Sequence, residues 1–125
     1  MDGLHAGRVV WVGLERGVGR EQAGRRPAVV VSSTDHLLIA SDLVTVVPAT
    51  ATDRGWPNHI ALRGPTDLDR PTFAITEQTR TVSRRRIVAV GGAIDADCLD
   101  ELMTWVGDWL HLPGRREGPG RFART

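Results

Sequence analysis

The sequence of 125 residues contains no lysine and no tyrosine, and it has a single cysteine, Cys98. All sixteen basic residues are therefore arginines, which excludes mechanisms that need a lysine amine, such as a Schiff base or a P-loop. One cysteine cannot form an internal disulfide, and so sparse a use of cysteine is typical of a protein in the reducing cytoplasm.

Long hydrophobic runs are also lacking. No apolar segment approaches the roughly 18 residues that a membrane-spanning helix needs, and Met1–Val10 has no signal-peptide pattern. We therefore expect a cytoplasmic protein without a membrane partner. The formal net charge is only +1, so bulk charge does not indicate a nucleic-acid-binding protein.

Motifs for metals and cofactors are missing as well. The four histidines are scattered, and neither a His-x-x-x-His nor a Cys-x-x-Cys spacing occurs. The carboxylates at 95–101 are explained by helix capping. There is no dinucleotide fingerprint and no Gly-x-Ser-x-Gly elbow. We expect neither a metal nor a cofactor.

What is present is a series of short apolar segments separated by turn residues. With 41% hydrophobic residues, the chain can close one core. Alternating or continuous apolar runs predict strands at 8–14, 27–32, 43–49, 58–62, 72–82 (bent in the middle) and 87–93, with a helical turn at 35–40. Pro48 is expected to stop the third strand because proline lacks a ladder donor. Short strands at this spacing favour a small β-barrel or sandwich.

The pattern changes near the C-terminus. Apolar residues at 99, 102, 103, 106 and 110 predict an amphipathic helix over Asp97–Leu110, capped by Asp95 or Asp97. Beyond it, Arg115–Thr125 is rich in glycine, proline and arginine, a composition typical of a disordered tail. We therefore predict one domain over residues 1–112 and a tail over 113–125.

Two polar residues stand at the ends of predicted strands. Arg26 precedes Pro27, which biases Arg26 toward extended backbone and fixes where its side chain leaves the strand. An arginine placed there can bind a phosphodiester through two hydrogen bonds. Thr50 follows the third strand, where its hydroxyl can donate to a phosphoryl oxygen. Taken singly, each residue also fits an ordinary solvated strand end.

Four motifs occur in order along most of the chain: G-x-E-Q-x-G-x-R-P-A-V-V-V-S at 19–32, V-V-P-x-T at 46–50, P-x-H-I at 57–60 and E-Q-x-R-T-V at 77–82. Together they resemble the MazF/PemK family of toxins from type II toxin–antitoxin systems, over roughly residues 7–112. The resemblance implies a mainly β, SH3-like β-barrel with a C-terminal α-helix and short connecting helical turns. It also implies a homodimer and a MazE-like antitoxin as partner.

The resemblance further implies a metal-independent endoribonuclease that cleaves single-stranded RNA at a short sequence. Attack by the ribose 2′-hydroxyl would leave a 2′,3′-cyclic phosphate and a 5′-hydroxyl. The family's catalytic arginine and threonine correspond to Arg26 and Thr50. By its ordinary pKa, Glu21 is the better general base and His59 a rival, although a position within a strand favours a structural role for His59.

The expected RNA-binding residues come from three segments. Arg20 and Gln22 lie in the first loop, Gln78 and Arg80 in the fourth motif, and Thr52 and Trp56 in the connection after Thr50. Trp56 could stack on a base or pack against its own loop. Trp105 and Trp109 are expected in the core or a dimer contact. The alternative function is that of a CcdB-like toxin, which shares the barrel and binds DNA gyrase without cutting RNA.

Overall fold

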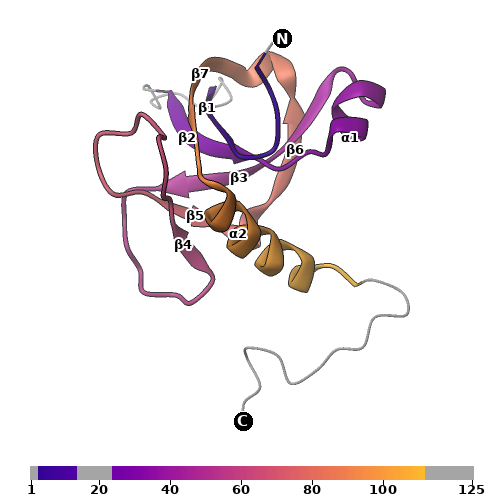
Figure 1. Ribbon diagram of the computed structural model, residues 1–125. Coiled ribbons are helices and arrows are strands. Elements are labelled where there is room, and N and C mark those ends of the chain that lie inside the picture. Colours follow the sequence, from indigo (N-terminus) through magenta and orange to yellow (C-terminus); the bar gives the residue numbers. More distant parts are fainter. Residues whose placement is uncertain (1–2, 14–23, 112–125) are drawn as a thin grey trace.

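A computed structural model describes residues 3–13 and 24–111 of the chain. The described part holds seven strands, two α-helices and two short 3₁₀ helices (η1 and η2), shown in Figure 1. In chain order they are β1 (Arg8–Gly13), β2 (Arg25–Val30), α1 (Thr34–Ile39), β3 (Leu43–Thr50), β4 (His59–Ala61), β5 (Phe73–Ile75), η1 (Thr76–Gln78), β6 (Arg80–Ser83), η2 (Arg84–Arg86), β7 (Ile87–Ala93) and α2 (Ala96–Trp109).

The strands form one antiparallel sheet around β3. The order is β4-β5-β3-β2-β1-β7, and β6 pairs with the first half of β3. β3 pairs with β6 from Leu43 to Val46 and with β5 at Ala49 and Thr50. This change of partner folds the sheet over on itself (Figure 1). No ladder joins β6 to β7 within residues 3–13 and 24–111, so the predicted SH3-like architecture is barrel-like rather than fully closed.

Strand alternation sends side chains into two apolar clusters. On one side of the sheet, Val9, Val29 and Val47 pack with Leu102 and Trp105 of α2. On the other side, the cluster that includes Val10, Ala28, Val30, Val44 and Val46 fills the interior of the barrel. β2 is therefore buried on both faces along Ala28–Val30, as its continuous apolar run predicts.

α2 lies across one side of the barrel (Figure 1) and begins as expected. The Asp95 side chain accepts a hydrogen bond of 2.8 Å from the backbone N–H of Cys98, which caps the helix. The predicted buried stripe is partly wrong. Leu102 and Val106 are buried as predicted, and Trp105 lies in the core, one of the two places expected for it, but Met103 and Leu110 are exposed. The helix rests on the sheet with a face rotated from the one that the apolar spacing indicates.

Two strand predictions also need correction. β3 continues through Pro48 to Thr50 instead of stopping. The missing N–H is tolerated because β6 pairs only as far as Val46 and β5 begins at Ala49, so proline sits where the strand changes partner. The polar series 77–81 is not one strand, because Glu77 and Gln78 belong to η1 and only its end enters β6.

No helix in residues 3–13 and 24–111 is long and apolar enough to cross a membrane. The predicted tail at 113–125 and most of the connection between the predicted strands at 8–14 and 27–32 lie outside the described residues, and the domain boundary at residue 112 stays a prediction.

Candidate active site

Arg26 and Thr50 lie on neighbouring antiparallel strands. The register pairs Ala28 with Pro48, Val29 with Val47 and Val30 with Val46. Continuing that register by two residues sets Arg26 opposite Thr50. Residues directly opposite each other on antiparallel strands project from the same face of the sheet, with Cβ atoms about 5 Å apart. The pairing itself ends at Ala28 and Pro48, so Arg26 and Thr50 lie two residues beyond it, at the same end of the two strands.

Both the Arg26 guanidinium and the Thr50 hydroxyl have hydrogen-bond donors that are available to a ligand. Arg26 pairs with Val12 through the β1–β2 ladder, but its side chain is exposed and makes no ion pair or hydrogen bond with any residue in 3–13 and 24–111. The Thr50 hydroxyl oxygen accepts a hydrogen bond of 3.1 Å from the Thr52 backbone N–H. Since a hydroxyl both accepts and donates, its hydrogen is still available to another acceptor. A guanidinium and a hydroxyl so placed can both donate to an anionic oxygen.

The neighbouring arginine has a different role. Arg25 lies over the Trp11 ring, with its guanidinium carbon 4.8 Å from the ring centroid, in a cation–π contact. Because successive strand residues face opposite sides of the sheet, Arg25 and Arg26 project in opposite directions. Arg25 is engaged with the barrel wall, and Arg26 faces the side of Thr50.

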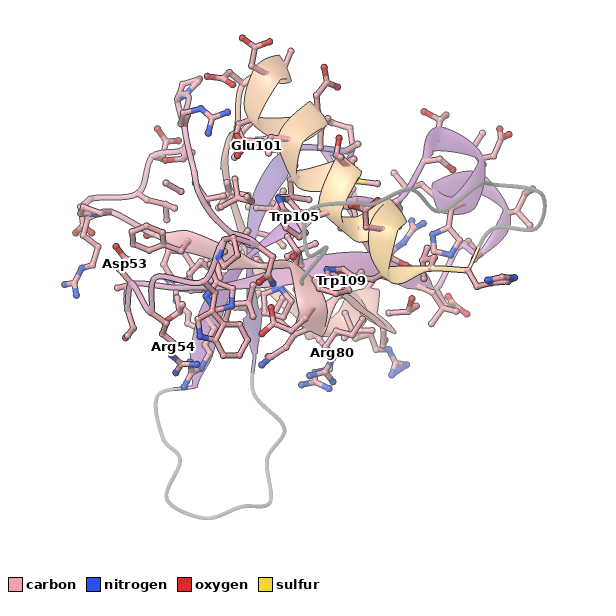
Figure 2. All side chains as sticks on the ribbon, turned by 90° about the horizontal axis from the view of Figure 1, so that it is seen from below. Asp53, Arg54, Arg80, Glu101, Trp105 and Trp109 are labelled. Carbon is pink, nitrogen blue, oxygen red and sulfur yellow. The ribbon has the colours of Figure 1, made fainter. Side chains whose placement is uncertain are left out.

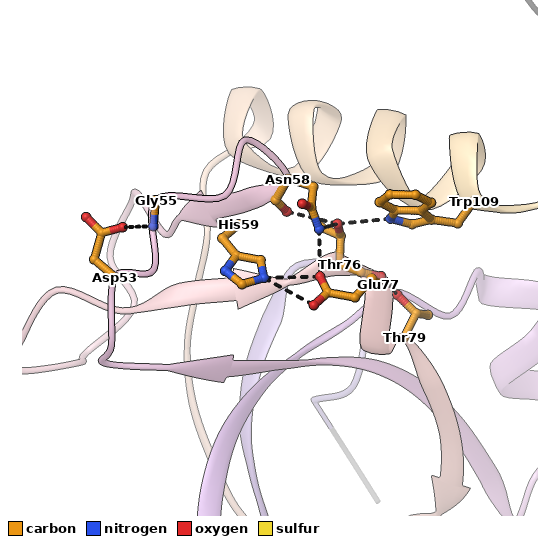
Figure 3. A network of polar contacts seen from close by, with 8 residues as sticks. All are labelled: Asp53, Gly55, Asn58, His59, Thr76, Glu77, Thr79 and Trp109. Carbon is orange, nitrogen blue, oxygen red and sulfur yellow. Dashed lines mark hydrogen bonds and ion pairs between the residues drawn. The ribbon is translucent and has the colours of Figure 1, made fainter. Parts of the chain in front are cut away.

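A buried polar cluster joins the β4 turn to η1 (Figure 3). The Glu77 carboxylate accepts hydrogen bonds from Asn58 Nδ2 at 2.6 Å and from His59 Nε2 at 3.1 and 3.2 Å. Burial raises the pKa of Glu77, but hydrogen bonds from its own backbone, His59 and Asn58 outweigh burial, and the net pKa is lowered. Glu77 therefore holds its negative charge inside the cluster.

His59 is buried, as its strand position predicts. Its side chain is 1% exposed and its Nε2 is engaged by Glu77. Its Nδ1 is buried with no hydrogen-bond partner among the described residues. The ring also stacks on Trp56, with centroids 4.8 Å apart and planes 24° from parallel. These contacts support the structural role of His59 over its role as a general base.

Thr76 ties this cluster to α2. Its hydroxyl donates to the Asn58 backbone carbonyl at 2.9 Å and accepts from Asn58 Nδ2 at 3.2 Å and from Trp109 Nε1 at 3.1 Å. Sequence reasoning missed this network. Glu77 belongs to a recognised motif, but nothing in the sequence indicates that Asn58 binds Glu77 or that Trp109 binds Thr76.

The predicted RNA-binding residues are only partly described. Thr52 and Trp56 lie in the exposed connection between β3 and β4, Gln78 ends η1, and Arg80 begins β6. Figure 2 places Arg80 and the additional Arg54 along one edge of the molecule. Arg20, Glu21 and Gln22 lie outside the described residues.

Arg80 and Glu77 also line a groove of about 650 Å³. Polar residues of β3 and β6, including Thr45 and Thr81, form one part of its wall. Apolar residues at the end of α2, including Met103 and Trp109, form another part. A groove with both kinds of wall suits an extended polymer or a peptide with apolar anchors.

The fold and this site define a small antiparallel barrel whose edge carries an arginine, a hydroxyl and further cationic side chains. Residues 5–110 match the family described as PemK-like, MazF-like toxin of type II toxin–antitoxin system. The chain belongs to this family. The match decides against the CcdB-like alternative.

Individual relatives agree with the family match. The chain is 32% identical to the endoribonuclease toxin MazF of Escherichia coli K12 over 79 residues, which cover 63% of this chain and 68% of that protein. It superposes on the MazF of a MazE–MazF crystal structure from Deinococcus radiodurans with a TM-score of 0.69 and 27% identity, covering 83% and 92% of the two chains. Toxin MazF-mt6 of Mycobacterium tuberculosis, at 19% identity, shares the fold with a TM-score of 0.66 over 82% and 94%.

Proposed function

We propose that this protein is the toxin of a toxin–antitoxin pair and cleaves single-stranded RNA, mRNA above all, at a short sequence. The observation that supports the proposal is the β2–β3 register, which is paired as far as Ala28 and Pro48 and, when extended by two residues, sets Arg26 opposite Thr50. The relative from Escherichia coli is named an endoribonuclease toxin, which supports the same reaction for this chain.

The reaction is an in-line displacement within the RNA. The ribose 2′-oxygen attacks the adjacent phosphorus and the bond from phosphorus to the 5′-oxygen breaks, giving a 2′,3′-cyclic phosphate and a 5′-hydroxyl. Negative charge grows on the non-bridging oxygens during the attack. The Arg26 guanidinium and the Thr50 hydroxyl donate to those oxygens, and one well-placed donor of this kind lowers the barrier by about 3–4 kcal/mol.

Proton transfer needs a different group, because an arginine stays protonated up to a pH of about 12. Glu21 takes the proton of the 2′-hydroxyl as general base, a role that a carboxylate can fill. Arg26 also donates a hydrogen bond to the departing 5′-oxygen, which takes up its proton from solvent water. No metal ion or cofactor takes part.

Substrate binding uses positive charge and one aromatic ring. Arg20 and Arg80 each neutralise a phosphate of the RNA backbone. Gln22, Thr52 and Gln78 offer hydrogen bonds to bases or sugars. Trp56 supplies an aromatic surface for an unpaired base.

The protein partner is a MazE-like antitoxin, as in the Deinococcus radiodurans complex. An acidic segment of the antitoxin would lie across the same RNA-binding surface and compete with RNA for its arginines. The toxin works in the cytoplasm as a homodimer. Residues 1–112 form the toxin domain, and the arginine-rich residues 113–125 form a separate tail.

The test is to incubate purified protein with a long RNA, with and without EDTA, and to map the new ends. Cuts at a recurring short sequence with 5′-hydroxyl ends support the proposal, and they must persist in EDTA. An intact RNA rejects the proposed activity. Cleavage that stops in EDTA and returns with added Mg²⁺ rejects the metal-independent mechanism.

A further inference from the structure

Trp56 is a large aromatic side chain that the fold holds half exposed. Its side chain lies in the connection between β3 and β4, and the residue is 50% exposed. One face of the indole is covered by the His59 ring at 4.8 Å. A tryptophan stacked on one side and open to solvent on the other offers a flat surface for a second ring.

The orientation of this surface is set by buried contacts. The backbone N–H of His59 donates to the Trp56 carbonyl at 3.1 Å, closing a tight turn through Pro57 and Asn58. His59 itself is held by both carboxylate oxygens of Glu77, and Asn58 donates to one of them at 2.6 Å. Both residues that end the turn are thus tied to the same carboxylate, as Figure 3 shows.

The charge around Trp56 suits a polyanion. Arg54 is exposed two residues before Trp56, and Arg80 lies on the same edge of the molecule (Figure 2). Proteins that bind single-stranded nucleic acid combine aromatic faces for the bases with cationic groups for the phosphates. A paired base has its faces covered by its neighbours in the helix, so only an unpaired base can stack on an isolated indole.

We propose that the open face of Trp56 stacks on one unpaired base of the RNA, and that His59 and Glu77 are positioning residues that hold the indole ready for it. The inference rests on the proposed ribonuclease function. It gives the buried His59 ring, whose Nδ1 has no hydrogen-bond partner among the described residues, a role: the flat ring supports Trp56 while Nε2 anchors that ring to Glu77.

The first test compares cleavage kinetics of Trp56→Ala and Trp56→Phe. Removing one base–aromatic stack weakens binding about 5- to 100-fold, so Trp56→Ala should raise KM by that factor and leave kcat at saturating RNA unchanged. Trp56→Phe keeps an aromatic face and should restore most of the loss. The matched control is Val88→Ala. Val88 is 55% exposed on β7, at the opposite end of the strand order from β4. The KM of Val88→Ala for RNA should equal that of the wild type.

The second test asks whether His59 acts through Trp56. His59→Ala should raise KM by a similar factor, and the double variant with Trp56→Ala should lose no more than either single variant, because both remove the same stack. The Trp56 emission, taken as the difference from Trp56→Phe, should change in His59→Ala. If His59→Ala does not fold, Glu77→Ala takes its place, since Glu77 is partly exposed and alanine removes the acceptor that anchors Nε2.

A binding assay separates this inference from the proposed activity. A mixed-sequence single-stranded oligodeoxynucleotide lacks the 2′-hydroxyl and cannot be cut by 2′-oxygen attack, yet its bases can quench the Trp56 emission. Quenching that disappears in Trp56→Phe supports the stack even if no RNA is cleaved. Normal cleavage and binding by Trp56→Ala, or additive losses in the double variant, overturn the inference and leave the ribonuclease standing. Loss of antitoxin affinity alone in Trp56→Ala overturns it too, in favour of a protein contact.

Discussion

The indole Nε1 of Trp109, in the last turn of α2, donates a hydrogen bond of 3.1 Å to the hydroxyl of Thr76 at the start of η1. Thr76 is completely buried and also exchanges hydrogen bonds with Asn58 beside β4. A single hydroxyl therefore joins the C-terminal helix, the η1 turn and the β4 turn. The position of α2 and the geometry of the Glu77 cluster are thereby coupled.

This coupling predicts a measurable stability loss. Trp109→Phe keeps the aromatic contact with Trp105, whose ring centroid is 6.0 Å away, but loses the donor to Thr76. A net hydrogen bond of this kind contributes about 0.5–1.5 kcal/mol, and urea unfolding should show a loss in that range. The control is Leu110→Ala, which is 58% exposed and should change stability by less than about 0.5 kcal/mol. Equal effects of the two variants would contradict the coupling.

Substitution of Gly92 should cause a much larger loss of stability. A Cβ atom at Gly92 would lie 1.9 Å from the backbone oxygen of Pro65 and 2.9 Å from the carbonyl carbon of Thr66. Backbone hydrogen bonds hold these segments together, so the clash cannot be relieved by a side-chain rotation. Gly92→Ala should cost about 3 kcal/mol or more. At Gly91 the nearest atoms are 3.5 Å away, so Gly91→Ala should unfold near the wild-type urea midpoint.

Much of the fold follows from local patterns. The apolar alternation of 8–13, the continuous run through Ala28–Val30 and the series at 87–93 each predict a strand that the structure contains. These predictions succeed because burial of one or both faces fixes the side-chain period. The buried face of α2 is harder to predict from the sequence. Trp105 and Met103 are both apolar, and the shape of the sheet beneath decides that Trp105 is buried and Met103 is exposed.

The candidate site likewise has a part that the sequence predicts and a part that it does not. The motifs point to Arg26 and Thr50, and the β2–β3 register that aligns them follows from strand pairing. The cluster around Glu77 cannot be read from the sequence, because its partners come from a β4 turn, a 3₁₀ turn and a helix end. Contacts between elements far apart in sequence depend on packing, which local patterns do not specify.

Glu77 predicts a pH dependence of stability. Its folded pKa lies below its ordinary value of 4.5, so the ionised form is favoured by folding. The stabilisation it provides is complete above about pH 4.5 and is lost as the pH falls through the lowered folded pKa. Urea midpoints should therefore show a constant gap between wild type and Glu77→Gln from pH 7 to pH 5, and that gap should shrink below pH 4.5. Other carboxylates titrate in both proteins and cancel in the difference. A gap independent of pH down to pH 2 would show that the charge of Glu77 is not involved.

Glu21 predicts a separable kinetic effect. If Glu21 removes the 2′-hydroxyl proton, Glu21→Gln should lower the single-turnover cleavage rate by about 10²- to 10⁴-fold. RNA affinity should change little, since glutamine keeps the size and an acceptor oxygen. Rapid-quench measurement at saturating enzyme separates the two quantities. A Glu21→Gln protein that cuts at the wild-type single-turnover rate leaves Glu21 with a binding role alone.

Arg26 and Arg25 offer a matched pair for the central proposal. Arg26→Ala and Thr50→Ala each remove a donor aimed at the phosphoryl oxygens and should lower the cleavage rate by at least about 10²-fold. Both variants should fold normally, because the Arg26 side chain is exposed and forms no ion pair or hydrogen bond within the described residues, and the Thr50 hydroxyl accepts only from the backbone N–H of Thr52.

Arg25→Ala removes the same charge one residue away, on the opposite face of β2, where the guanidinium lies over Trp11. It should cut RNA within a few-fold of wild type at the same protein concentration. Thr50→Ser keeps the hydroxyl and should retain more activity than Thr50→Val, which keeps only the shape. If Arg25→Ala and Arg26→Ala lose cleavage equally, general positive charge rather than the alignment of Arg26 with Thr50 drives the reaction, and the assignment of these two residues to the phosphoryl oxygens is wrong.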